Sequence, residues 1–134
     1  MILYLDSSAF AKRHAPDERD SRGCSELIER FEVWVTSRIS AIEVPRALHR
    51  SMALPEAVQA TRRFDEDLRE TNVIAIDADV STMARDLAIR EHVKSLDAIH
   101  LASALTFPPA AVSFLTYDRQ QARVARALGF QLAH

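Results

Sequence analysis

The sequence is poor in cysteine and glycine, and each shortage excludes a class of functional site. A single cysteine, Cys24, in 134 residues allows neither a disulfide within the chain nor a metal site built from several thiolates, which suits a reducing compartment. Two glycines, Gly23 and Gly129, are too few for a Walker phosphate loop or for the glycine fingerprint of dinucleotide-binding proteins. Nucleotide binding through either motif is therefore excluded.

Long apolar runs and a strong charge imbalance are also missing. The N-terminal apolar run ends at Asp6 and has no basic leader, and no later segment is long enough to span a bilayer. We therefore expect a cytoplasmic protein with no membrane partner. Seventeen basic and nineteen acidic residues give a formal net charge of −2, so we expect any contact with nucleic acid to be local rather than spread over a basic surface.

Short apolar segments alternate with segments of helical periodicity along the chain. The segments with the composition of buried strands are residues 1–5, 33–36, 73–77, 112–117 and 130–132. The helices expected between them cover residues 7–13, 18–32, 37–52, 55–68, 80–88, 95–105 and 118–128. This alternation predicts one domain over residues 1–134, an α/β sandwich in which helices cover both faces of a mainly parallel sheet.

A proline interrupts the helix expected at residues 37–52. Pro45 lacks a backbone donor and restricts Val44, so we expect a kink or a late helix start at this point. The next helix begins near Pro55, because proline suits a first helical turn. We expect the two helices to form a hairpin over residues 38–70.

Four acids lie where one predicted element gives way to the next. Asp6 ends the first strand, Asp118 follows the fourth, and Glu43 and Asp97 lie early in helices. Because the carboxyl ends of parallel strands share one edge of a sheet, the two acids that follow strands should lie at the same edge. Each acid also has a structural explanation. Asp6 and Asp118 suit helix N-caps, Glu43 suits a capping box with Ser40, and Asp97 suits a first turn, facing the helix dipole.

Convergence of these four acids would have a chemical consequence. Like charges within a few ångströms raise each other's pKa and destabilise a fold unless a cation neutralises them. An all-oxygen cluster without thiolate or imidazole ligands favours a hard ion such as Mg²⁺ or Mn²⁺. Because water activated by such an ion can attack phosphorus, the pattern predicts metal-dependent hydrolysis of phosphodiester bonds.

Four segments, in chain order, carry a family resemblance. They are Leu5-Asp-Ser-Ser8, Glu43-Val-x-Arg-Ala47, Leu96-Asp-Ala-Ile-His-Leu-Ala-Ser-Ala104, and Phe114-Leu-Thr-Tyr-Asp118 leading to Ala-Leu-Gly-Phe130. Together they cover nearly the whole chain and resemble the PIN-domain ribonucleases, most closely the VapC-type toxins of bacterial and archaeal toxin–antitoxin pairs. The resemblance implies a three-layer α/β/α sandwich with a five-stranded, mainly parallel sheet. It also implies endonucleolytic cleavage of RNA with Mg²⁺ or Mn²⁺, homodimers, and a cognate antitoxin that covers the hairpin.

The resemblance also implies roles for individual residues. Asp6, Glu43 and Asp97 match the three acids that hold metal in this family, and Asp118 matches a fourth, more variable acid. Two hydroxyl residues match positions that support the site, namely Ser7 and Thr116. Ser8 is an alternative hydroxyl contact, although it equally suits a helix start.

Basic residues and one histidine near these positions are weaker candidates. The side chains that could hold substrate phosphate, or else lie as solvated surface charges, are Lys12, Arg13, Arg46 and Arg119. His100 lies three positions after Asp97, and we expect it to pack its helix rather than to bind that acid. The leading hypothesis is a metal-dependent endoribonuclease toxin that cleaves single-stranded or loop RNA.

Two other functions remain open from the sequence. A receiver-like signalling domain would need an adjacent acidic pair, a phosphoacceptor after the third strand and a lysine after the fifth. The chain offers only Asp77 after the third strand, which we interpret as a helix cap. A catalytically inactive PIN-like binding protein is the other alternative, and the retention of all four acids counts against it.

Overall fold

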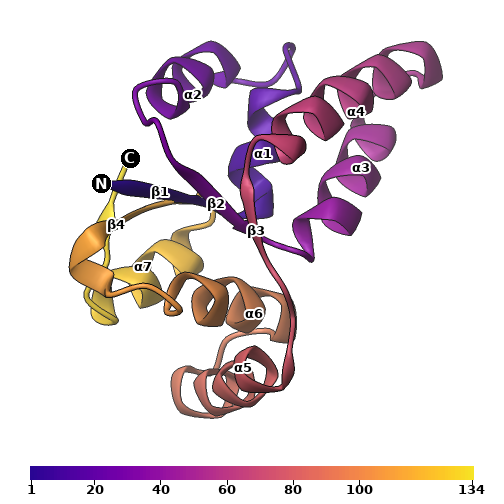
Figure 1. Cartoon of the computed structure of the whole chain (residues 1–134). Coiled ribbons are helices and arrows are strands. Elements are labelled where there is room, and N and C mark those ends of the chain that lie inside the picture. The colour runs from indigo at the N-terminus through magenta and orange to yellow at the C-terminus, as the bar shows by residue number, and fades with distance from the viewer.

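A five-stranded parallel sheet forms the middle layer of the protein, shown for residues 1–134 as a computed structural model in Figure 1. The strand order is β3-β2-β1-β4-β5, and every neighbouring pair runs parallel. The strands are β1 (Ile2–Leu5), β2 (Trp34–Ser37), β3 (Asn72–Ile74), β4 (Val112–Leu115) and β5 (Gln131–Leu132). The first strand of the chain is therefore the central strand of the sheet.

Seven α-helices cover the two faces of the sheet. They are α1 (Ser7–Arg13), α2 (Ser21–Ile28), α3 (Ser40–Ser51), α4 (Leu54–Arg69), α5 (Ala78–Glu91), α6 (Ser95–Ala104) and α7 (Arg119–Ala127), with a short 3-10 helix at Pro109–Ala111. Figure 1 shows α1 to α4 on one side of the strands and α5 to α7 on the other. None of the helices combines the length and apolarity that crossing a bilayer requires. The predicted three-layer α/β/α sandwich is confirmed.

Residues of β1 supply both halves of the core. Leu3 and Leu5 pack with residues of α1 to α4, whereas Tyr4 packs with residues of α5 to α7. All three side chains are fully buried. An uninterrupted apolar run is expected for a parallel strand covered on both faces, because neither set of alternating side chains meets water. The run ends at Asp6, where the strand leaves the sheet.

Several predicted boundaries differ from the structure by a few residues. The helix expected at residues 18–32 is shorter, since α2 covers only Ser21–Ile28. The third strand ends at Ile74 rather than at residue 77. It pairs only with β2, so it is an edge strand, and edge strands are often very short. Asp77 caps α5 by accepting a hydrogen bond from the Val80 N–H at 2.8 Å, as the sequence indicated.

Of the two alternatives expected at Pro45, a kink or a late helix start, the late helix start is wrong. Helix α3 begins at Ser40 and continues through Pro45 to Ser51. A proline inside a helix costs about 3 kcal/mol, because it removes a backbone hydrogen bond and crowds the preceding turn. Val44 and Leu48 offset this cost by burial in the core with residues of α4. The predicted hairpin is confirmed, since α3 packs along α4.

Candidate functional site

Parallel pairing of β1 with β4 brings two strand ends together at one edge of the sheet. Leu5 pairs with Leu115, and the Asp6 N–H donates to the Leu115 carbonyl at 3.2 Å. Asp6 therefore leaves the sheet beside Thr116, and Asp118 follows two residues later. The sequence-based expectation that both acids lie at the same edge is correct.

Asp6 is a buried carboxylate, with only 4% of its surface exposed. Its Oδ1 accepts hydrogen bonds from the Ser8 hydroxyl at 2.6 Å and from the Ala9 N–H at 3.1 Å, so Asp6 also caps α1. Burial raises the pKa of Asp6, although the neighbouring His100 and the hydrogen bonds to the carboxylate oppose that rise. A cation beside this carboxylate would stabilise its charged form.

Two hydroxyl groups link the residues that follow β4 to Asp6 through hydrogen bonds. The Ser8 hydroxyl donates to Asp6 and accepts from the Tyr117 N–H at 3.0 Å. Thr116 Oγ1 lies 3.4 Å from Ser8 Oγ and accepts from the Asp118 N–H at 3.1 Å. Thr116 thus lies beside the acids, as the family resemblance implies, and Ser8 rather than Ser7 makes the hydroxyl contact with Asp6.

Glu43 projects from α3 toward α1 and α6. Its Oε1 accepts from the Ser7 hydroxyl at 2.6 Å and lies 2.9 Å from His100 Nε2, whereas its Oε2 makes no hydrogen bond within the protein. Burial, the largest single influence, raises the pKa of Glu43, but His100 and Ser7 together bring that pKa below its ordinary value. Glu43 is therefore held as a carboxylate with one oxygen free.

The alternative explanation of Glu43 as a capping-box partner of Ser40 is wrong. Ser40 is the first residue of α3, not its N-cap, and no side chain caps this helix. The Ser40 hydroxyl lies 2.7 Å from Thr36 Oγ1 and 3.2 Å from Ser7 Oγ, so it bonds backward to β2 and α1. The carboxylate of Glu43 is free to reach Ser7 and His100 instead.

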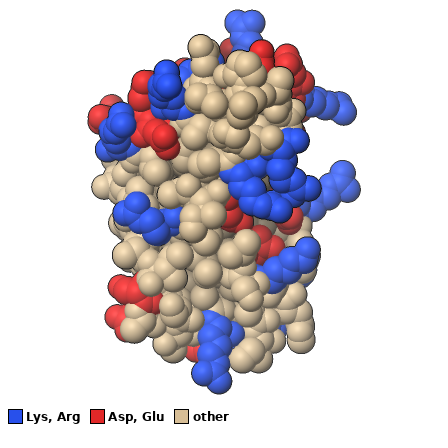
Figure 2. All heavy atoms as spheres, turned by 90° about the vertical axis from the view of Figure 1, so that its right-hand side faces the viewer, with Lys and Arg blue, Asp and Glu red and all other residues tan.

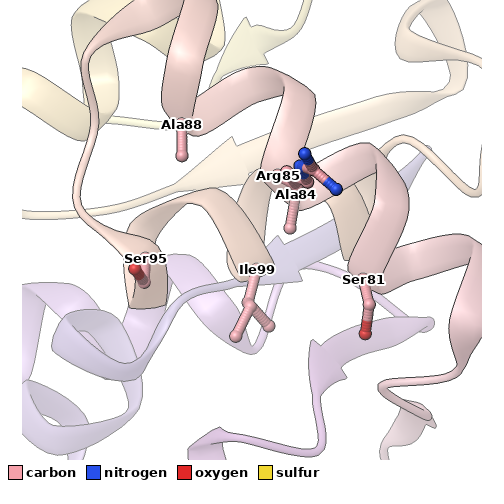
Figure 3. Close-up of a pocket in the computed structure, with 6 residues that line it drawn as sticks. All are labelled: Ser81, Ala84, Arg85, Ala88, Ser95 and Ile99. Atoms are coloured by element: carbon pink, nitrogen blue, oxygen red, sulfur yellow. The ribbon is translucent and has the colours of Figure 1, made fainter.

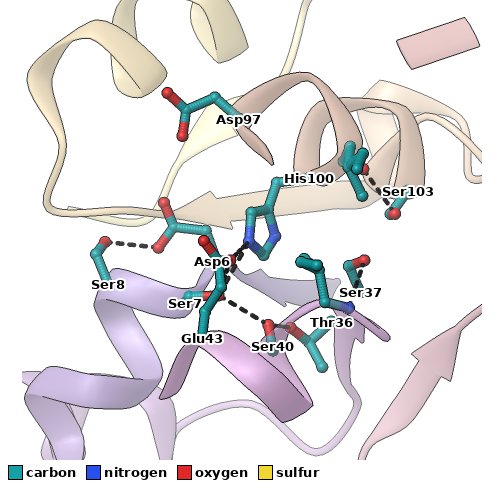
Figure 4. Close-up of polar contacts among 12 residues, drawn as sticks. Asp6, Ser7, Ser8, Thr36, Ser37, Ser40, Glu43, Asp97, His100 and Ser103 are labelled. Carbon is teal, nitrogen blue, oxygen red and sulfur yellow. Dashed lines mark hydrogen bonds and ion pairs between the residues drawn. The ribbon is translucent and has the colours of Figure 1, made fainter. Parts of the chain in front are cut away.

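His100 is the residue whose contacts the sequence did not reveal. It packs edge-on against the Tyr4 ring, as a packing role predicts, with ring centroids 6.0 Å apart. It also bonds Glu43 and lies 3.0 Å from Ser7 Oγ, and no hydrogen bond joins it to Asp97. Figure 4 shows the imidazole between the helix that carries Asp97 and the carboxylates of Asp6 and Glu43. In the sequence, only the spacing Asp97-x-x-His100 indicated a polar contact for His100. The partner that His100 has in the structure, Glu43, lies 57 residues away in the sequence.

Asp97 lies in the first turn of α6 and is half-buried. Burial is the largest influence that raises the pKa of Asp97, and the charges of Asp118, Asp6 and Glu43 raise it further. The carboxylate of Asp97 makes no hydrogen bond within the protein, and the charge of His100 opposes this rise in its pKa. All four predicted acids therefore belong to one electrostatic group.

Gln121 joins the two remaining acids through α7. Its side-chain Nε2 donates to the Asp97 backbone carbonyl at 3.2 Å, and its N–H donates to Asp118 Oδ1 at 2.9 Å. Asp118 is thus the N-cap of α7 that the sequence predicts, and its residue is exposed. The side chain of Gln121 does not close a capping box, because it reaches Asp97 instead.

The donor chemistry of this group fits a hard divalent cation. All four acids offer oxygen only, Glu43 Oε2 and both carboxylate oxygens of Asp97 take no hydrogen bond, and like charge raises the pKa of Asp97. In this arrangement, nevertheless, no three of the acids are close enough to ligate one ion directly. No other group of three acids, histidines or cysteines in the protein could hold a metal ion either. An ion that keeps several waters, as Mg²⁺ does, suits such a spacing.

A groove of about 630 Å³ runs beside the acids. Its lining comes from α1, α3, the turn before α3 and the first turn of α6, and consists of Ser7, Ser8, Ala11, Ile39, Ile42, Glu43, Arg46, Ala47 and Leu96. In Figure 2, acidic atoms are recessed in the middle of this side of the molecule, and Lys and Arg side chains project around them. The site is therefore a negatively charged hollow with a partly basic rim.

The four basic candidates differ in their partners. Lys12 donates to the Arg19 carbonyl at 2.9 Å and lies over the Tyr117 ring, and Arg13 makes ion pairs with Asp67 at 2.8 Å and Glu29 at 3.1 Å. Arg46 lines the groove and is exposed, and Arg119 is exposed at the start of α7; neither makes an ion pair.

A second cavity, of about 200 Å³, lies between α5 and α6 (Figure 3). Its lining consists of Ser81, Ala84, Arg85, Ala88, Ser95 and Ile99. No carboxylate lines it, so it is separate from the acidic group.

Comparisons with known proteins bear on the family and the fold of the chain. A family model described as PIN domain matches residues 3–127. The chain is 30% identical over 130 residues to Ribonuclease VapC35 of Mycobacterium tuberculosis, covering 95% of this chain and 92% of the relative. Among solved structures, it is similar to M. tuberculosis VapC20, described as a Sarcin-Ricin loop cleaving toxin, with a TM-score of 0.75, 17% identity, and coverage of 91% of this chain and 94% of the other. It is also similar to a toxin-antitoxin complex from Klebsiella pneumoniae, with a TM-score of 0.72, 19% identity and 98% coverage of both chains.

Proposed function

The chain belongs to the PIN-domain family, and from this we propose that it is a metal-dependent endoribonuclease acting as the toxin of a toxin–antitoxin pair. The match to the PIN domain over residues 3–127 carries the proposal. The raised pKa of Asp97, due first to burial and then to the charges of Asp118, Asp6 and Glu43, supports it. We propose that residues 1–134 form a single PIN domain.

We propose that Asp6, Glu43 and Asp97 hold Mg²⁺ or Mn²⁺, directly or through water, with Asp118 beside them. When bound, the ion supplies an activated water for attack on phosphorus and neutralises the charge that develops on the phosphate. Ser8 and Ser7 each fix one carboxylate oxygen, on Asp6 and Glu43 respectively. The unfixed oxygens of these acids remain for the ion and its waters.

The groove and its rim support RNA as the substrate. Arg46 lines the groove with Glu43, Arg119 follows Asp118, and neither makes a competing ion pair, so we propose that both bind phosphates of the substrate. Lys12 and Arg13 are more distant candidates for the same role. With a net charge of −2, the protein has no broad basic surface for duplex, which favours single-stranded or loop RNA.

The α3–α4 hairpin supports a protein partner. Ile42, Leu54 and Val58 are large apolar side chains exposed on these two helices, which is a pattern typical of an interaction surface. We propose that a cognate antitoxin covers this hairpin, as expected for a relative of toxins found with antitoxins. We also propose that the protein acts in the cytoplasm as a homodimer.

Cleavage of single-stranded RNA by purified protein free of antitoxin tests the proposal. Wild-type protein should cleave with Mg²⁺ or Mn²⁺ and stop when the ion is chelated. Asp97→Asn should cleave far less, whereas Asp77→Asn should cleave normally, because asparagine still caps α5. Equal cleavage by Asp97→Asn and the wild type would overturn the assignment of the site.

A further inference from the structure

A buried histidine joins three elements of the protein beside the acids. His100 lies in α6 with 3% of its surface exposed, and its two ring nitrogens have different partners. Nε2 lies 2.9 Å from Glu43 Oε1 and 3.0 Å from Ser7 Oγ, and Nδ1 lies 2.8 Å from the hydroxyl of Tyr4. We propose that His100 is a positioning residue, oriented by Tyr4, that holds Glu43 so that its second oxygen is available to the metal.

The direction of the hydrogen bonds follows from a count of protons. Ser7 has one hydroxyl proton and donates it to Glu43 Oε1 at 2.6 Å. In its contact with His100, Ser7 must therefore accept, so His100 Nε2 carries a proton. That proton is shared between Ser7 Oγ and Glu43 Oε1. The carboxylate consequently receives two donors on Oε1 and none on Oε2.

Tyr4 fixes the orientation of the imidazole from the other side. Its ring is fully buried, stacks on Phe114 at 5.0 Å and meets His100 edge-on. Burial raises the pKa of Tyr4 well above its ordinary value, so its hydroxyl keeps its proton. With one ring proton on Nε2, Nδ1 accepts from this hydroxyl. A metal ligand held by a hydrogen-bonded partner that is itself held is the arrangement that tunes many metal sites.

The inference rests on the proposed metal-dependent function, because it assigns Glu43 to the ion. A positioning role for His100 differs from a purely structural role in one measurable respect. A histidine that only fills the core stabilises the fold, whereas a histidine that positions Glu43 also sets the affinity for the ion.

The contact between His14 and Asp67 resembles the contact between His100 and Glu43 and can serve as a control. His14 Nε2 lies 2.7 Å from Asp67 Oδ2, and its ring meets Phe64 edge-on at 6.1 Å, much as the His100 ring meets Tyr4. The His14 side chain is 8% exposed. Asp67 is not among the four acids, so loss of His14 removes the same kind of contact without touching the proposed metal site.

Calorimetric titration with Mn²⁺ on the full chain separates the two roles. His100→Leu should weaken Mn²⁺ binding by roughly 10- to 100-fold, and Tyr4→Phe should weaken it in the same direction. His100→Gln should recover most of the loss, because its amide N–H replaces Nε2–H. His14→Leu should lower thermal stability and leave Mn²⁺ affinity unchanged. If folded His100→Leu and folded Tyr4→Phe both bind Mn²⁺ as tightly as His14→Leu does, the proposal is overturned.

Nitrogen NMR of the metal-free protein tests the hydrogen-bond direction without any metal. The His100 ring should carry its proton on Nε2, and Tyr4→Phe should shift the Nδ1 resonance. A ring protonated on Nδ1 alone would overturn the inference.

The two proposals fail in different ways. If the wild type neither binds Mn²⁺ nor cleaves RNA, the proposed function fails, and the inference fails with it. If Mn²⁺ binding and cleavage both depend on Asp97 while His100→Leu, His100→Gln and Tyr4→Phe bind Mn²⁺ as the wild type does, only the role of His100 is overturned.

Discussion

His100 Nε2 lies 2.9 Å from Glu43 Oε1, and this contact joins α6 to α3 across the acidic end of the sheet. Each helix carries one of the predicted metal ligands, Asp97 on α6 and Glu43 on α3. The contact therefore sets the relative position of two acids that no strand connects.

Asp97→Asn should stabilise the metal-free protein at neutral pH. The pKa of Asp97 is raised from its ordinary value of 3.8. Below that value the Asp97 carboxyl is protonated in both the folded and the unfolded chain, so it does not affect stability. As pH rises, the unfolded chain loses this proton first. The free energy of unfolding therefore falls as pH rises from the ordinary pKa through the raised pKa of the folded protein. Urea unfolding at pH 3.5 and pH 7 should show a gain for Asp97→Asn only at the higher pH.

Asp67→Asn is the matched control, because the charge of Asp67 should affect stability in the opposite direction to that of Asp97. Arg13 and His14 lower the pKa of Asp67 despite its partial burial, so its charge stabilises the fold above its ordinary pKa and this contribution is lost as pH falls. The substitution should therefore cost stability at pH 7. Equal responses of the two variants to pH would contradict the account of the acidic group.

Ser8→Ala should weaken Mn²⁺ binding, because it removes the 2.6 Å hydrogen bond that fixes Asp6 Oδ1. By analogy with other residues that support metal ligands, the loss should be about 10-fold or more. Ser51→Ala is a suitable control, since its hydroxyl donates to the Leu48 carbonyl of its own helix. Calorimetry on both variants makes the comparison, and an equal loss for Ser51→Ala would count against the role of Ser8.

Arg46→Ala and Arg119→Ala should each raise KM for RNA with little change in kcat, because a phosphate contact outside the reacting centre contributes similarly to ground and transition states. The slope of log binding affinity against log salt concentration should become shallower by about one for each substitution. Arg22→Ala is the control, since Arg22 is 94% exposed and pairs only with Glu26 on α2. An unchanged salt dependence in both Arg46→Ala and Arg119→Ala would remove these residues from the substrate site.

Pro45→Ala should raise the free energy of unfolding by roughly 1 to 3 kcal/mol. Alanine restores the backbone donor that α3 lacks at this position, although it also makes the unfolded chain more flexible. Urea unfolding measures the change. A loss of stability would mean that the conformation of α3 around Glu43 depends on the proline.

The sequence predicted most of what depends on strand topology. An apolar run that stops at Asp6 and another that stops before Asp118 were sufficient to place these two acids at one edge, because parallel strands share their carboxyl ends. The contacts of His100 and Ser8 could not be predicted, since Ser7 and His100 are 93 residues apart and Ser8 and Tyr117 are 109 apart. Such pairs depend on the packing of α6 and on side-chain rotamers. The late helix start at Pro45, one of two alternatives, was wrong because local propensity favours a break there, whereas burial of Val44 and Leu48 favours a continuous helix.

The central claim is that Asp6, Glu43 and Asp97 hold one metal site. Anomalous diffraction from crystals grown with Mn²⁺ tests it most directly. The account predicts an anomalous peak between these three carboxylates, with Glu43 Oε2 facing the ion and Oε1 still bonded to His100. Mn²⁺ bound elsewhere on the protein, or no peak in this hollow at a concentration that supports RNA cleavage, would contradict it.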